Sequence, residues 1–135
     1  MSTLSYTLEE LPSIAKKIIA DSSSKTLLFY AEMGVGKTTL IKEIIKQLGS
    51  TDTVTSPTFS LVNEYSTPDG LVYHFDFYRL NDEMEALDFG IEEYFEKDTW
   101  LFLEWPNKIP NLLPEVYQKI SITREGNKNE IIISG

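Results

Sequence analysis

The sequence contains no cysteine, which excludes disulfides, thiolate metal sites and a cysteine nucleophile. Basic residues are scarce: 12 lysines and arginines stand against 21 acidic residues, for a formal net charge of −9. Contacts with the phosphate backbone dominate the affinity of proteins for nucleic acids, so a chain this acidic is a poor candidate for binding RNA or DNA unaided. Any role in nucleic-acid metabolism is expected to pass through a protein partner.

Long apolar runs are also missing. No segment approaches the length needed to span a membrane, and the N-terminus lacks the charged and apolar regions of a signal peptide. We therefore expect a soluble, cytoplasmic protein that does not bind membranes. Its 135 residues predict one domain over 1–135, large enough for a core but small for a nucleotide enzyme.

The segment from Ala31 to Thr39 has the form of a phosphate-binding loop, G-x-x-x-x-G-K-[ST], with alanine in place of its first glycine. An apolar strand (26–30) precedes it, and a helix with an apolar stripe follows. Backbone N–H groups near the glycines would cradle an anion at the helix N-terminus. Lys37 would reach the β- and γ-phosphates, and the Thr38 hydroxyl would ligate Mg²⁺. The predicted nucleotide-binding residues are Glu32, Met33, Gly34, Val35, Gly36, Lys37, Thr38 and Thr39.

The remaining pattern predicts an α/β sandwich whose mixed parallel and antiparallel sheet is flanked by helices. Thr7 and Glu10 form a capping box before an amphipathic helix, which Pro12 limits at its start. Alternating strands at 59–65 and 71–76 form a hairpin. Asn81 could cap a short helix over 82–87, and two closing strands occupy 116–123 and 130–134.

The phosphate-binding loop needs an acidic partner at the end of a nearby strand. Asp76 and Glu104 are the two candidates, and either could instead be an ordinary strand-end carboxylate facing water. The continuous apolar run 99–104 favours Glu104, because a strand buried on both faces belongs beside the loop's own strand.

Several other residues have two possible interpretations. The segment Ser56, Pro57, Thr58 and Phe59 is either a loop sensitive to the γ-phosphate or a plain turn. Arg79 is the only well-placed arginine for stabilising phosphoryl transfer. For His74 a structural role is favoured over catalysis, and Trp105 could pack in the core or anchor a partner.

Four blocks in this order and spacing resemble the bacterial TsaE (YjeE) family of tRNA threonylcarbamoyladenosine biosynthesis. They are Glu32 to Thr39, Thr55-Ser56-Pro57-Thr58-Phe59, His74-Phe75-Asp76-Phe77-Tyr78-Arg79-Leu80 and Leu103-Glu104-Trp105-Pro106. The resemblance implies a Mg²⁺-dependent ATPase, slow alone, that joins TsaB- and TsaD-type proteins to modify adenosine 37 of tRNA. It would meet tRNA only indirectly.

The resemblance also implies residue roles. Thr38 and Glu104 would be associated with Mg²⁺, Lys37 and Asp76 would act with Glu104 in catalysis, and Ser56 to Phe59 would respond to the nucleotide. Trp105 would lie at the nucleotide site or partner surface, and the stretch from Thr7 to Leu11 would approach the adenine. Two rival interpretations are a small-molecule kinase and a nucleotide-sensing module without hydrolysis. No motif in the sequence distinguishes ATP from GTP.

Overall fold

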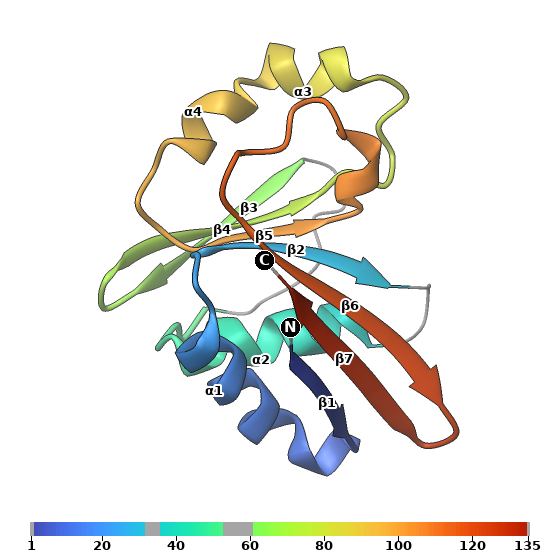
Figure 1. The fold of residues 1–135 in the computed structure, drawn as a ribbon. Coiled ribbons are helices and arrows are strands. Elements are labelled where there is room, and N and C mark those ends of the chain that lie inside the picture. The colour runs from blue at the N-terminus through green and yellow to red at the C-terminus, as the bar shows by residue number, and fades with distance from the viewer. Residues whose placement is uncertain (1, 32–35, 53–60, 135) are drawn as a thin grey trace.

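The computed structural model describes residues 2–31, 36–52 and 61–134. In these residues seven strands form one sheet, with helices on both of its faces (Figure 1). The helices are α1 (Leu11–Asp21), α2 (Lys37–Gln47), α3 (Glu83–Phe89) and α4 (Ile91–Phe95). The strands are β1 (Ser2–Tyr6), β2 (Thr26–Ala31), β3 (Val62–Thr67), β4 (Gly70–Asp76), β5 (Leu101–Glu104), β6 (Gln118–Glu125) and β7 (Lys128–Ser134).

The strand order β1-β7-β6-β2-β5-β4-β3 combines parallel and antiparallel pairing. The central strands β6, β2, β5 and β4 run parallel to one another, whereas β1, β7 and β3 pair antiparallel with their neighbours. All four residues of β5 are buried, as expected for a central strand covered on both faces. The predicted α/β sandwich with a mixed sheet is confirmed.

Alternate residues of the central strands contribute to two separate cores, because successive side chains point to opposite faces of a sheet. Phe29, Val72 and Phe102 pack in the layer that contains α1 and α2. Leu28, Phe75 and Leu103 pack in the layer that contains α3 and α4. The same alternation decides to which face of the sheet the side chain at the carboxyl end of each strand points.

The predicted beginning of the first helix is confirmed. The backbone N–H of Thr7 donates to Glu10 Oε1 at 3.0 Å, a single 3₁₀ turn covers Leu8–Glu10, and α1 starts at Leu11 with Pro12 in its first turn. Proline is tolerated there because its missing N–H would have no helical partner.

Three local expectations differ from the structure. Strand β1 was not predicted, because its pairing with β7 joins opposite ends of the chain. Asp82, not Asn81, caps α3, accepting the N–H of Met84 at 2.9 Å. Strand β6 begins later than expected, at Gln118, and the turn to β7 is shorter, because pairing continues to Glu125 and Lys128.

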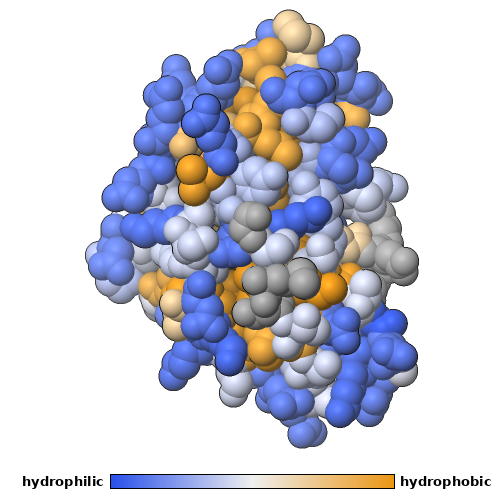
Figure 2. Space-filling view, viewed as in Figure 1, coloured by the Kyte–Doolittle hydropathy of each residue, from blue (hydrophilic) through white to orange (hydrophobic). Residues whose placement is uncertain are grey.

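The visible surface is largely hydrophilic (Figure 2). Apolar side chains gather at the top of that view, over the region of α3. Among the described residues, none of the helices has both the length and the apolar character required to cross a membrane.

Candidate nucleotide and metal site

The two candidate carboxylates lie on neighbouring strands at one edge of the sheet. Asp76 ends β4, Glu104 ends β5, and the two are register partners. Glu104 is also the register partner of Phe29 near the end of β2. This edge is where ligands bind in open parallel sheets. The sequence alternatives, Asp76 and Glu104, are thus brought together.

The first turn of α2 faces this edge. Gly36 precedes the helix with φ +87°, a left-handed conformation that glycine adopts without penalty. Lys37 and Thr38 begin the helix, so both stand where free backbone N–H groups and the helix dipole favour an anion.

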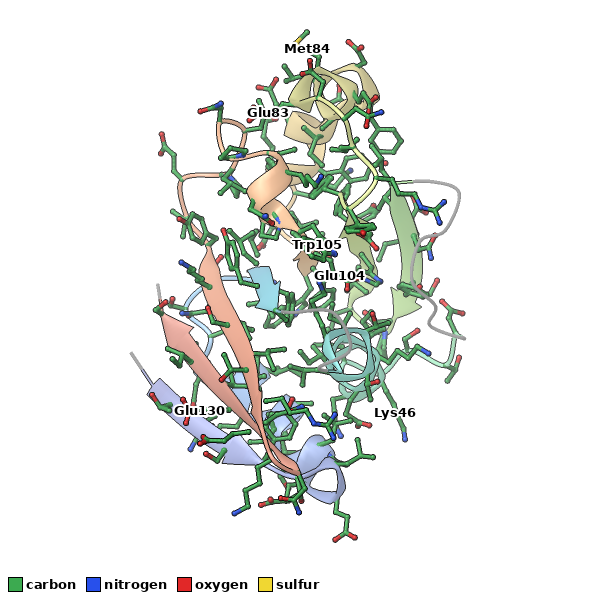
Figure 3. The ribbon with its side chains drawn as sticks, turned by 90° about the vertical axis from the view of Figure 1, so that its right-hand side faces the viewer. Lys46, Glu83, Met84, Glu104, Trp105 and Glu130 are labelled. Atoms are coloured by element: carbon green, nitrogen blue, oxygen red, sulfur yellow. The ribbon has the colours of Figure 1, made fainter. Side chains whose placement is uncertain are left out.

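Glu104 is the centre of the site and is 2% exposed. Its Oε1 lies 3.3 Å from Thr38 Oγ1 and 3.8 Å from Lys37 Nζ. Its Oε2 lies 2.5 Å from Nε2 of the fully buried His74. A hydroxyl, an ammonium and an imidazole thus surround one buried carboxylate. In Figure 3, Glu104 and Trp105 lie in the middle of the molecule, far from Met84 at its outer edge.

Burial opposes the charge of two groups at this site. Desolvation lowers the pKa of Lys37 from its usual value, although the nearby carboxylates of Glu104 and Asp76 oppose this shift. Desolvation raises the pKa of Asp76, and the charge of Glu104 adds to the rise, whereas the N–H donated by Tyr78 opposes it. Perturbed groups of this kind are frequent at functional sites.

Trp105 closes one side of the site. Its ring centroid lies 4.5 Å from Lys37 Nζ and 4.9 Å from the Tyr78 ring. Its backbone has φ 57° and ψ 48°, which is uncommon for a bulky residue and costs on the order of 1–3 kcal/mol. Lys37 and Trp105 line a pocket of about 170 Å³ with the end of β2. Trp105 therefore belongs to the site and also contacts Tyr78, which is 45% exposed.

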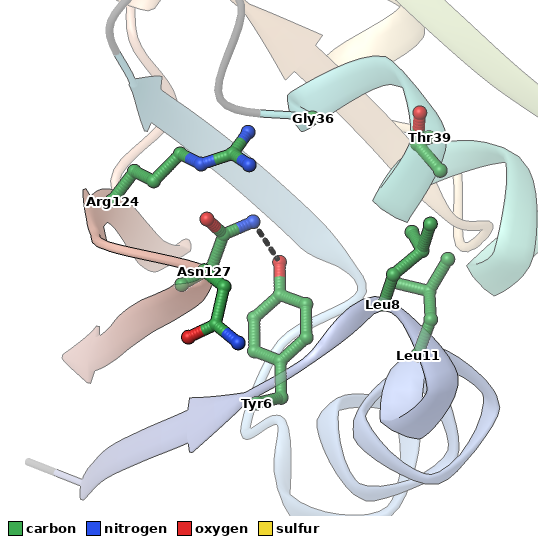
Figure 4. A pocket seen from close by; sticks show the side chains of 8 residues that line it. Tyr6, Leu8, Leu11, Gly36, Thr39, Arg124 and Asn127 are labelled. Atoms are coloured by element: carbon green, nitrogen blue, oxygen red, sulfur yellow. Dashed lines mark hydrogen bonds between the residues drawn. The ribbon is translucent and has the colours of Figure 1, made fainter.

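A second pocket, of about 240 Å³, reaches the N-terminus of α2 at Gly36 and Thr39 (Figure 4). It is lined by Tyr6, Leu8, Leu11, Gly36, Thr39, Arg124, Asn127 and Asn129. Leucines from the 3₁₀ turn and the start of α1 thus face polar side chains from the β6–β7 hairpin, and the Asn129 amide donates to the Tyr6 hydroxyl. Leu8 and Leu11, from the stretch Thr7 to Leu11 that was expected to approach the adenine, line this pocket beside Gly36. The hairpin residues were not predicted, and Arg124, one of only two arginines, was the available signal.

Other predicted site residues are tested only in part. Glu32, Met33, Gly34, Val35, Ser56, Pro57, Thr58 and Phe59 lie outside the described residues. Arg79 is exposed on the segment between β4 and α3, and its role in phosphoryl transfer stays a prediction. The contact of His74 with Glu104 was missed, because it joins strands thirty residues apart.

The fold, with α2 directly following the central parallel strand β2, is that of the P-loop NTPase class. It resembles the crystal structure of Bacillus subtilis YdiB, with a TM-score of 0.70 and 31% identity over 96% of this chain and 83% of that one. The chain belongs to the TsaE family: the model for "Threonylcarbamoyl adenosine biosynthesis protein TsaE" matches residues 5–132.

Two relatives are named tRNA threonylcarbamoyladenosine biosynthesis protein TsaE. The Bacillus subtilis protein is 38% identical over 88% of this chain and 75% of its own length. The Haemophilus influenzae protein is 39% identical over 69% of this chain and 60% of its own length. The family resemblance predicted from the sequence is confirmed.

Proposed function

We propose that this chain is a Mg²⁺-dependent ATP-binding protein with slow ATPase activity, which supports threonylcarbamoylation of adenosine 37 in tRNA within a multi-protein complex. The observation that carries the proposal is the pairing of Thr38 and Glu104 at the first turn of α2. The names of its relatives support the pathway.

The two pockets suggest how ATP would lie. Its phosphates would meet Lys37 and the N-terminus of α2, where charge and backbone N–H groups favour an anion. Its base and ribose would occupy the pocket between Leu8 and Leu11 on one side and the β6–β7 hairpin on the other. Leu8 and Leu11 would contact the flat faces of the base, and Arg124, Asn127 and Asn129 would offer polar groups to its edge or to the ribose.

The donor atoms at the site fit Mg²⁺. A hydroxyl and a carboxylate supply the oxygen ligands that this ion prefers, and it commonly takes only one or two carboxylates together with substrate phosphates. Within the described residues there is no group of three or more histidines and acids that could hold a metal by itself. When bound, Mg²⁺ would neutralise charge that develops on the transferred phosphoryl group.

The chain's own groups would share the remaining work. Lys37 would hold the β- and γ-phosphates, leaving Trp105 and Glu104 as it does so. Asp76, whose pKa burial raises, would orient the attacking water or accept its proton. Of the two arginines, Arg79 is the candidate for stabilising the transferred phosphoryl group, because it follows Asp76 by three residues. We expect slow hydrolysis until partners join.

The partners we propose are TsaB- and TsaD-type proteins of the cytoplasm. With a net charge of −9, this chain would contact tRNA through them and not directly. The candidates for transmitting the nucleotide state to a partner are Trp105, Tyr78 and the segment Ser56 to Phe59.

The test is ATP hydrolysis by the purified chain with Mg²⁺, alone and with both partners, using Lys37→Ala as the blank. We expect slow turnover that changes when the partners are added. Fast turnover unaffected by the partners would contradict the partner-coupled role, and phosphate on a small acceptor would indicate a kinase.

A nucleotide-sensing module without hydrolysis is distinguished by the variants Asp76→Ala and Glu104→Ala. An ATPase loses turnover in these variants but keeps much of its ATP binding.

A further inference from the structure

His74 is the only histidine of the chain, and the structure buries it completely in β4. It shares a face of that strand with Val72, which packs in the core beneath α1 and α2. Its ring also reaches the neighbouring parallel strand, where Nε2 lies 2.5 Å from Glu104 Oε2. An apolar side chain would fill this space in the core equally well, so packing alone does not explain a hydrogen bond from a histidine to Glu104.

The hydrogen-bonding partners define where the proton of this ring lies. An ionised carboxylate only accepts hydrogen bonds, so Nε2 must donate to Glu104. The other ring nitrogen, Nδ1, is buried and has no hydrogen-bond partner among the described residues. A proton there would be a buried donor without an acceptor, which is more costly than a buried lone pair. The expected form is therefore the tautomer with its proton on Nε2.

This contact divides the work of the two Glu104 oxygens. Oε2 is held by His74 on the side of the core, and Oε1 is left facing Thr38 Oγ1 and Lys37 Nζ. The last torsion of a glutamate side chain has no sharp preference of its own. The orientation of Oε1 toward α2 thus depends on what holds Oε2.

We infer that His74 is a positioning residue, which holds one oxygen of Glu104 so that the other faces the Thr38 hydroxyl and binds a divalent cation with it. The inference rests on the proposed function, in which Thr38 and Glu104 hold Mg²⁺. Groups that orient a metal ligand from behind commonly change metal affinity about 10–100-fold when they are lost.

The first experiment measures the Mg²⁺ concentration that half-maximally enhances ATP binding, by calorimetric titration. His74→Leu removes the donor, whereas His74→Gln offers an amide N–H in its place. Val72→Ala is the matched control, because it also loosens the core on the same face of β4 without touching Glu104. Thermal unfolding of each variant monitors stability separately.

We expect His74→Leu to raise the half-saturating Mg²⁺ concentration about 10–100-fold, while ATP binding in the presence of a chelator stays within about twofold of wild type. His74→Gln should recover most of the loss. A lower unfolding temperature with an unchanged Mg²⁺ requirement in both variants would overturn the inference.

The second experiment needs neither nucleotide nor metal. With one histidine in the chain, a ¹H–¹⁵N correlation spectrum of the imidazole reports on His74 alone. We expect a protonated Nε2 protected from exchange with water, and loss of that protection in Glu104→Ala. A proton on Nδ1, or no response to Glu104→Ala, would contradict the positioning role even if His74→Leu had not folded.

The two proposals fail in different ways. If wild-type ATP binding showed no dependence on Mg²⁺, the proposed function would be wrong, whatever the tautomer of His74. If wild type depended on Mg²⁺ and Glu104→Ala removed that dependence, but His74→Leu did not weaken it, only the positioning role would be wrong.

Discussion

Asp76 and Lys37 are charged side chains that the fold partly withdraws from water. Each is beside Glu104, and each has a pKa shifted toward its neutral form, mainly by desolvation. Such groups reduce the stability of the empty protein. Their cost would be offset when a nucleotide and its cation supply the missing charges.

At residue scale, Asp76→Asn should stabilise the protein at pH 7.5. The folded pKa of Asp76 is raised above 3.8, so the native state binds more protons than the unfolded state in the window above that value. The stability that Asp76 contributes is thus lost as the pH rises through its folded pKa. Asp76→Asn should therefore raise the melting temperature more at pH 7.5 than at pH 5. Asparagine can still accept the N–H of Tyr78.

The measurement is thermal unfolding without ligand at both pH values, with Asp69→Asn in the exposed β3–β4 turn as the control. A melting temperature below that of wild type at pH 7.5 would show that the charge of Asp76 stabilises the fold.

Trp105 provides a second prediction at this scale. Its ring lies 4.5 Å from the ammonium of Lys37, and under the proposed function Lys37 would turn toward the phosphates when ATP binds. In a Trp100→Phe background Trp105 is the only tryptophan, so ATP should change its emission. Adding Lys37→Ala should remove most of that response. Equal changes with and without Lys37 would show that the cation–π contact does not report binding.

At the scale of elements, Gly49, two residues after the end of α2, lies close to Pro68 in the β3–β4 turn. Gly49 has φ +102°, and a Cβ built there would lie 2.7 Å from Pro68 Cδ. Gly90, between α3 and α4, has a similar φ of +91° but open space around it. The two positions share the backbone requirement and differ in the contact.

Chemical denaturation of Gly49→Ala and Gly90→Ala should separate these effects. Gly90→Ala should cost about 1 kcal/mol for its left-handed backbone. Gly49→Ala should cost a further 1–3 kcal/mol or so, because the proline ring must move. Equal losses of unfolding free energy in the two variants would show that the Pro68 ring moves aside at no measurable cost.

At the scale of the whole molecule, charge is distributed unevenly. The segment 82–98, which holds α3 and α4, carries eight acidic residues and a single lysine. This face therefore opposes direct contact with a nucleic acid.

We expect the isolated chain not to bind tRNA measurably at physiological salt, and tRNA to be retained only when the partner proteins are present. Fluorescence anisotropy of labelled tRNA, repeated at low salt, measures this directly. Tight binding by the chain alone would contradict the indirect role.

Much of the fold was predictable because its signals are local. The strand before the loop, the capping box of Thr7 and Glu10, and the doubly buried strand ending in Glu104 each depend on neighbours within a few residues. Strand β1 was missed because its only described strand partner is β7, more than 120 residues away. The choice between Asn81 and Asp82 as the cap depended on backbone angles that the sequence does not define.

By itself, the sequence determined the pattern that predicts a phosphate-binding loop, the candidate carboxylates and the family, because residue type and spacing carry that information. Only the tertiary structure decided that Asp76 and Glu104 are register partners, that His74 holds one oxygen of Glu104, and that the β6–β7 hairpin closes the second pocket. These relations join segments far apart in the chain. Strand order and register create them, and neither is written in any local pattern.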